Sequence, residues 1–171
     1  DYNWPQGSAA STQVSCASAV TNFPGGRNLL VNGGFDTWAA GTPSNWTKTG
    51  TIAQENSLVY SGASAVRVAA GQTPTLTQKF ADALVGTPAS VGVLTSIAFV
   101  LWIRGSAALS SGNLRIELVD GTGTAVNDAT GSPARVDFAL SGTGTSYVAK
   151  SGVIRTPAIL PSVLQLRVNV S

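Results

Sequence analysis

Residues 95–104 read TSIAFVLWIR, and their side chains alternate in a way that predicts a β-strand. Every second residue from Ile97 to Ile103 is large and apolar, whereas the intervening positions run from Ala98 to Arg104. Because successive side chains of a strand point to opposite faces of its sheet, the first set predicts a core face and the second an outer face. The same alternation recurs at residues 113–120, 134–140 and 163–170. In those runs, arginines and acids take many of the outer positions.

From Arg27 onward, short runs rich in β-branched, Leu and Phe residues are separated by Gly, Ser, Asn and Pro, as is typical of strands and turns. We expect strands near residues 28–31, 45–54, 57–60, 64–69, 75–80, 95–104, 113–120, 134–140, 146–154 and 163–170. A helical turn is expected only at 80–85. Ten short strands joined by turns predict an all-β protein of two packed antiparallel sheets.

The composition excludes several kinds of chemistry. The chain has 171 residues, no His and one Cys, so it offers no Ser-His-Asp or Cys-His nucleophile, no imidazole zinc site and no internal disulfide. Ten Lys and Arg against eight Asp and Glu give a net charge of +2 without a basic run. We therefore expect neither nucleic-acid binding nor membrane insertion. Paired acids such as Glu117 and Asp137 are too weak a signal for a glycosidase, and we expect no enzymatic activity.

Residues 1–26, DYNWPQGSAASTQVSCASAVTNFPGG, show no sustained period. We expect them to form an extended arm, followed by one domain at 27–171. The arm is either a linker from a preceding domain or a docking arm that uses Tyr2, Trp4 and Phe23 as anchors for assembly. Since the chain begins at Asp1 and lacks Met, we expect it to be a segment of a longer polypeptide.

Residues 28–68, NLLVNGGFDTWAAGTPSNWTKTGTIAQENSLVYSGASAVRV, carry a specific resemblance. Their Asn-Leu-Leu-x-Asn-Gly-Gly-Phe-acid stretch, Pro-x-x-Trp and Ser-Gly-x-x-Ala-x-x-Val strand resemble the opening of jelly-roll carbohydrate-binding modules with the galactose-binding-like fold. Later segments fit the same plan more loosely: LWIRG at 101–105, LRIELVD at 114–120 and LQLRV at 164–168. The resemblance implies a jelly-roll β-sandwich, and such modules also occur in phage tail, fibre and capsid-decorating proteins.

One departure from this family concerns the C-terminal strand. In the family a further strand follows the equivalent of LQLRVNV, whereas this chain ends at Ser171. The sandwich is therefore expected to lack its last strand and to have an open edge beside Leu166 and Val168. We expect residues 1–26, or another chain, to cover that edge.

The resemblance also implies a structural calcium ion. Asp36 matches the family position whose carboxylate holds the ion, and Asn28 and Ser61 match positions that give carbonyl oxygens. The second acid of the family site falls in the missing strand. The alternative is that Asp36 caps a turn through the backbone. No other cofactor is expected.

The candidate glycan-binding residues are Trp102, Arg104, Arg115 and Glu117. An aromatic ring beside guanidinium and carboxylate groups suits stacking and hydrogen bonding to a sugar. The alternatives are that Trp102 is covered by a loop or a neighbouring subunit and that the charged residues form ordinary cross-strand ion pairs. Trp38 and Trp46 are expected to pack in the core, and Asp120 and Asp128 to be turn acids.

Two functions remain open from the sequence. The first is a non-catalytic structural or display module of a bacteriophage virion that also binds host-surface glycan. The alternative is a glycan-binding module of a secreted bacterial polysaccharide-degrading enzyme. The expected partners are other virion subunits or a preceding domain, a cell-surface glycan, and further copies of the chain in a homo-oligomer.

Overall fold

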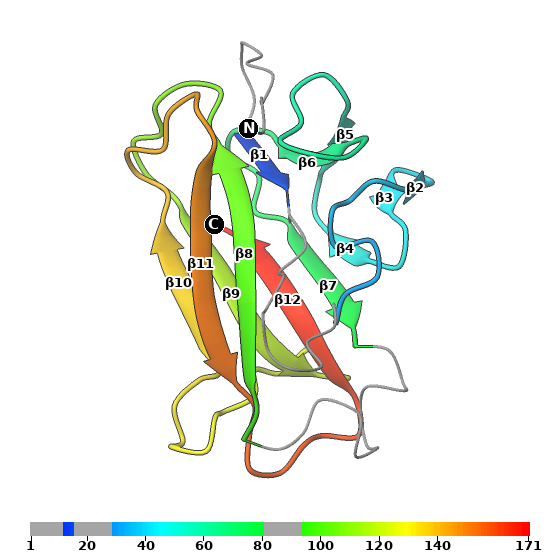
Figure 1. The fold of residues 1–171 in the computed structure, drawn as a ribbon, viewed down its shortest axis with the longest axis vertical. Helices are drawn as coiled ribbons and strands as arrows, with labels where there is room; N and C mark the ends of the chain where they lie inside the picture. The colour runs from blue at the N-terminus through cyan, green and yellow to red at the C-terminus, as the bar shows by residue number, and fades with distance from the viewer. Residues whose placement is uncertain (1–11, 16–28, 81–93) are drawn as a thin grey trace, which may run out of the picture.

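The computed structural model describes residues 12–15, 29–80 and 94–171, which form two five-stranded antiparallel sheets (Figure 1). In order across it, the β8 sheet contains β11 (Val148–Arg155), β8 (Ser96–Arg104), β1 (Thr12–Ser15), β6 (Ala65–Val68) and β5 (Ala53–Glu55). The β9 sheet contains β10 (Arg135–Ala139), β9 (Asn113–Asp120), β12 (Leu164–Val170), β7 (Thr75–Lys79) and β4 (Thr47–Thr49). A short hairpin joins β2 (Trp38–Ala39) to β3 (Thr42–Pro43). The all-β sandwich predicted from the sequence is thereby confirmed.

The core lies between the inner faces of these two sheets. β8 contributes Ile97, Leu101 and Ile103, each at most 7% exposed, and Phe99 packs against them. The facing sheet contributes buried side chains at Leu114, Ile116, Leu118, Leu164, Leu166 and Val168. These are the apolar positions of the period-two pattern, so the predicted inward faces of β8, β9 and β12 are confirmed. None of the described residues forms a helix long and apolar enough to cross a membrane.

The predicted open edge beside Leu166 and Val168 is wrong. β12 is paired on both sides, with Leu166 opposite Leu118 of β9 and opposite Gln78 of β7. The edges of this sheet are β10 and β4. The physical reason is that β7 and β9 both bring an unpaired strand edge to β12, which satisfies its backbone groups from two directions.

Residues 12–15, which fall within the predicted arm, form a strand of the sandwich. β1 lies between β6 and β8, and Val14 is opposite Val66 on one side and Ile103 on the other. β1 therefore pairs with backbone N–H and C=O groups of β6 and β8 that would otherwise lack partners in the middle of the sheet. The predicted assembly anchors Tyr2, Trp4 and Phe23 lie outside the described residues.

Two predicted strands are absent from the described part of the chain. Residues 31–34 form turns in place of a strand over 28–31, and residues 57–60 belong to a loop. Asn32 explains the first difference: its side-chain amide donates to Thr37 O and Ser44 O, and its Oδ1 accepts from Thr37 N. Such bonds give the backbone an alternative to a sheet ladder. The predicted helical turn at 80–85 falls almost wholly outside the described residues.

Deletion of residues 1–15 should destabilise the domain because it removes the central strand β1. At about 1 kcal/mol for each lost backbone hydrogen bond, the loss of pairing with both neighbours should lower the free energy of unfolding by several kcal/mol. Chemical denaturation measures this quantity. Deletion of residues 1–11, which leaves β1 in place, is the matched control, and equal stability of the two truncated chains would contradict the role given to β1.

Candidate functional site

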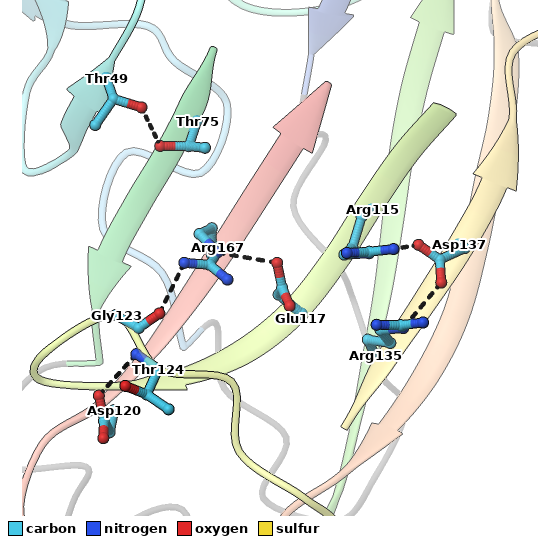
Figure 2. Close-up of polar contacts among 10 residues, drawn as sticks. All are labelled: Thr49, Thr75, Arg115, Glu117, Asp120, Gly123, Thr124, Arg135, Asp137 and Arg167. Atoms are coloured by element: carbon cyan, nitrogen blue, oxygen red, sulfur yellow. Dashed lines mark hydrogen bonds and ion pairs between the residues drawn. The ribbon is translucent and has the colours of Figure 1, made fainter. Parts of the chain in front are cut away.

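The outer side of the β9 sheet is a polar surface made by alternate residues of five strands, and we call it the polar face. Strand register sets these residues in two rows. The first row, from β10 to β4, consists of Arg135, Glu117, Arg167, Thr77 and Thr47. The second row consists of Asp137, Arg115, Asn169, Thr75 and Thr49. Since their neighbours on β9, β12 and β7 are core residues, these side chains point away from the core. Figure 2 shows the five charged residues of the two rows together with Thr49 and Thr75.

Ion pairs hold the charged side chains of the first row in place. The carboxylate of Glu117 is only 3% exposed and accepts a 2.9 Å hydrogen bond from Arg167 Nε. Arg167 Nη1 also donates to Gly123 O at 2.8 Å, which fixes the guanidinium over the sheet (Figure 2). A buried carboxylate needs such a partner, because an unpaired charge would be costly at this position.

Two guanidinium groups, one from each row, share the carboxylate of Asp137. Asp137 Oδ1 lies 2.6 Å from Arg115 Nε, and Asp137 Oδ2 lies 3.0 Å from Arg135 Nε. The hydrogen bond with Asp137 raises the pKa of Arg115. All three side chains are more than one-third exposed, so these pairs contribute little stability but do orient the guanidinium planes.

A polar pocket lies beside the second row. Its walls are formed by Asn113, Arg115, Asp137, Asn169 and Ser171. Asn113 and Ser171 exchange two backbone hydrogen bonds, which fix the floor of the pocket where β9 and β12 meet. The pocket therefore combines amide, hydroxyl, guanidinium and carboxylate groups on a rigid sheet.

The loop that supports Arg167 is closed by Asp120. Its Oδ1 accepts hydrogen bonds from Thr122 N, Thr122 Oγ1 and Thr124 N at 2.7–2.9 Å. The hydroxyl of Thr122 and these backbone amides lower the pKa of Asp120. The loop 128–132 repeats the arrangement around Asp128. Both residues are thus turn acids, as the sequence predicts.

The outer side of the β8 sheet carries a different cluster, made of aromatic rings. Tyr60 stacks on Trp102 with ring centroids 4.0 Å apart and an interplanar angle of 13°. Tyr147 meets Tyr60 edge-on at 5.3 Å, and the Arg104 guanidinium lies 5.5 Å from the Tyr147 ring centroid. Tyr147 also donates a hydrogen bond to Leu58 O, and burial raises its pKa to about 12. The loop that carries Tyr60 therefore covers one face of Trp102.

The structure separates the four residues predicted to bind glycan. Trp102 and Arg104 belong to β8, whereas Arg115 and Glu117 belong to β9, and the two pairs point outward from opposite sheets. They cannot form one site, because the core lies between them. Arg104 is also only 2% exposed. The polar face instead brings Arg115 and Glu117 together with Arg135, Asp137, Arg167 and Asn169.

Trp38 and Trp46 do not lie on either of these surfaces. Trp46 is 6% exposed and packs against Phe35 with ring centroids 5.2 Å apart, while Trp38 is half-buried against the core. Each indole nitrogen donates to a backbone carbonyl, of Phe35 for Trp38 and of Asn32 for Trp46. The predicted core role is confirmed for Trp46, whereas Trp38 packs against the core and is partly exposed.

Asp36 anchors the loop that precedes β6. Its Oδ1 accepts a 2.6 Å hydrogen bond from Ala63 N, and a Cβ on Gly62 would lie 1.9 Å from the same oxygen. Ser61 is exposed, and Asn28 lies outside the described residues. No group of three or more Asp, Glu, Cys or His side chains gathers among the described residues. This geometry fits a loop anchor better than a carboxylate-rich cation site, and calcium stays a prediction of the resemblance.

The comparisons with known proteins concern the fold. No protein-family model and no curated protein matches the chain. Among solved structures, TmCBM61 in complex with β-1,4-galactotriose matches with a TM-score of 0.51 and 16% identity, over 85% of this chain and 88% of that chain. The chain is therefore similar in fold to a carbohydrate-binding module.

Two further carbohydrate-binding modules match with lower scores. Family 16 carbohydrate-binding module 2 has a TM-score of 0.45 and 17% identity, over 69% of this chain and 72% of that one. The CBM22-1 xylan-binding domain of Xyn10C from Paenibacillus barcinonensis has a TM-score of 0.48 and 13% identity, over 96% of this chain and 94% of that one.

Substitution Trp102→Ala should destabilise the domain, because it removes the stacking partner of Tyr60. Beyond the lost buried area, we expect a coupling free energy of about 1 kcal/mol between the two rings. A double-mutant cycle with Tyr60→Ala, followed by denaturant unfolding, measures it. Additive effects of the two substitutions would show that the stack contributes no stability.

Substitution Asp36→Ala should lower the free energy of unfolding by about 1–3 kcal/mol because Ala63 N–H loses its acceptor. Asp36→Asn keeps an oxygen in that position and should lower it less. Melting curves with and without EDTA separate this role from metal binding. A fall in Tm with EDTA in the native chain, absent in Asp36→Asn, would establish the predicted calcium site.

Proposed function

We propose that this domain is a non-catalytic glycan-binding module and that the polar face is its binding surface. The observation that carries the proposal is the pocket beside the second row, where Asn113, Arg115, Asp137 and Asn169 meet on one rigid sheet. The fold shared with a carbohydrate-binding module supports it. Glycan binding through a sheet surface requires no moving part, since the strands hold every donor and acceptor in register.

The chemistry of the polar face suits the hydroxyl groups of a sugar chain. Asn offers both a donor and acceptors, Thr hydroxyls do the same, and Arg offers a planar set of donors. Adjacent strands are about 4.8 Å apart, so neighbouring groups in a row are spaced on the scale of one sugar ring. The threonines of β4 and β7 extend the rows beyond the charged residues, and Thr49 and Thr75 share a 2.6 Å hydrogen bond (Figure 2).

In this proposal the carboxylates of the polar face hold the arginines in place and do not take part in a reaction. Glu117 is paired with Arg167, and Asp137 is shared by Arg115 and Arg135. A glycosidase needs two carboxyl groups that can both reach the scissile bond, whereas here both carboxylates are already engaged by guanidinium groups. This arrangement supports a binding role over hydrolysis.

The aromatic cluster of the β8 sheet is the weaker candidate for glycan binding. Tyr60 already stacks on one face of Trp102, which leaves less ring surface for a sugar. A virion and a polysaccharide-degrading enzyme would both use a module that holds a glycan. Each of these settings stays a prediction of the sequence, and so does the homo-oligomer.

A glycan-array screen of the purified domain, followed by isothermal titration with the best ligand, tests the proposal. We expect Arg115→Ala and Asn169→Ala to weaken binding by about tenfold each, because each removes hydrogen bonds to the ligand. Arg155→Ala, an exposed arginine on β11 of the opposite sheet, is the matched control. Binding that survives both polar-face substitutions would contradict this location, and loss of binding in Trp102→Ala alone would move the site to the aromatic cluster.

A further inference from the structure

The polar face has more positive than negative groups, and the surplus positive charge lies where Arg115 and Arg135 share Asp137. Glu117 and Arg167 form an ion pair in the first row, so their charges balance, and the carboxylate is buried. Arg115 and Arg135 share the single carboxylate of Asp137. One guanidinium charge is therefore left over on this part of the polar face, where Arg115 lines the pocket and Arg135 lies in the adjoining row. Such a surplus of positive charge near a polar pocket favours a ligand that carries a negative charge.

The orientation of the two arginines leaves donors for such a ligand. Both reach Asp137 through Nε, at 2.6 Å for Arg115 and 3.0 Å for Arg135. A guanidinium carries five N–H donors in a planar fork, so bonding through Nε leaves the terminal nitrogens with further donors. Arg115 is 36% exposed and Arg135 38% exposed, so solvent and a ligand can reach both side chains. Arginine edges of this kind bind carboxylates in a bidentate manner.

The pocket supplies neutral partners around the same point. Asn113 and Asn169 lie with Arg115 and Asp137 in its wall, and Asn113 is exposed. A sugar ring placed there would meet amide groups at its hydroxyls and a guanidinium at a charged substituent. Such a mixture favours a charged sugar over a neutral one, because only a carboxylate gains a charge-assisted hydrogen bond from the guanidinium.

We propose that the polar face selects an acidic glycan, a chain of uronic acid residues whose carboxylates bind Arg115 and Arg135. This inference rests on the proposed function and names the ligand class of the same site. The surplus of about one charge is too small for the many phosphate contacts that drive nucleic-acid binding. A carboxylate matches the planar fork of arginine and can be spaced along a chain with hydroxyl groups between, as the pocket requires.

The test uses polygalacturonate and its fully methyl-esterified form, which share a backbone and differ in carboxylate charge. Affinity gel electrophoresis of the full chain at low salt should show retardation by polygalacturonate and at least about tenfold weaker binding to the ester, because the ester cannot pair with arginine. The retardation should decrease as salt is raised.

Two substitutions locate the charge selectivity. Arg135→Gln removes an exposed guanidinium from the edge strand β10 and should reduce the preference for the acid form over the ester, whereas Arg135→Lys should restore part of it. Arg155→Gln on the opposite sheet removes the same charge from the chain and should leave the preference unchanged. Melting curves verify that each variant is folded.

Each outcome has a distinct meaning. Equal binding of the acid and ester forms, or selective binding of a neutral glycan on the array, would overturn the acidic-glycan inference and leave the proposed function standing. Selectivity for the acid form that is the same in Arg135→Gln and Arg155→Gln would reflect net charge alone and would also overturn it. No binding to either polymer or to any glycan on the array would overturn both proposals.

Discussion

The central position of β12 is the constraint on which both the core and the polar face depend. Its backbone pairs with β9 on one side and β7 on the other, so it joins the two halves of the β9 sheet. Leu164, Leu166 and Val168 fill the core, while the residues between them project outward. A slip of one residue in this pairing would exchange the two sets of side chains, so the hydrophobic core also fixes which groups reach the polar face.

The two outer faces of the sandwich use their polar and aromatic residues differently. On the β8 sheet, Tyr60, Trp102 and Tyr147 pack on one another, so much of their ring surface is already in contact. On the β9 sheet, Arg115 and Arg135 pair side-on with Asp137 and remain accessible. Stacking uses up the surface that an aromatic ring would offer a ligand, whereas an ion pair through one nitrogen leaves the rest of a guanidinium able to donate.

The candidate site shows how far alternation along the chain can predict a surface. The pattern correctly assigned Trp102, Arg115 and Glu117 to outward positions, but it grouped residues from two sheets into one site. A period of two separates the faces of a single strand and carries no information on which sheet the strand joins. The segment between β8 and β9 takes the chain from one sheet to the other, so consecutive strands with similar outer residues face opposite directions.

The sequence alone predicts the bounds of the long strands from β7 to β12 and the inner and outer faces of β8, β9, β10 and β12. It also predicts the buried Trp46 and the turns closed by Asp120 and Asp128, because all of these depend on residues close in sequence. The tertiary structure decided three further features. β1 lies between β6 and β8, and β12 pairs with β7 and β9. Arg115, Arg135 and Asp137 lie together with Asn169 on one face. The reason is physical, because side-chain periodicity reports local geometry, whereas strand pairing is selected by the joint burial of apolar faces and the pairing of backbone groups far apart in the chain.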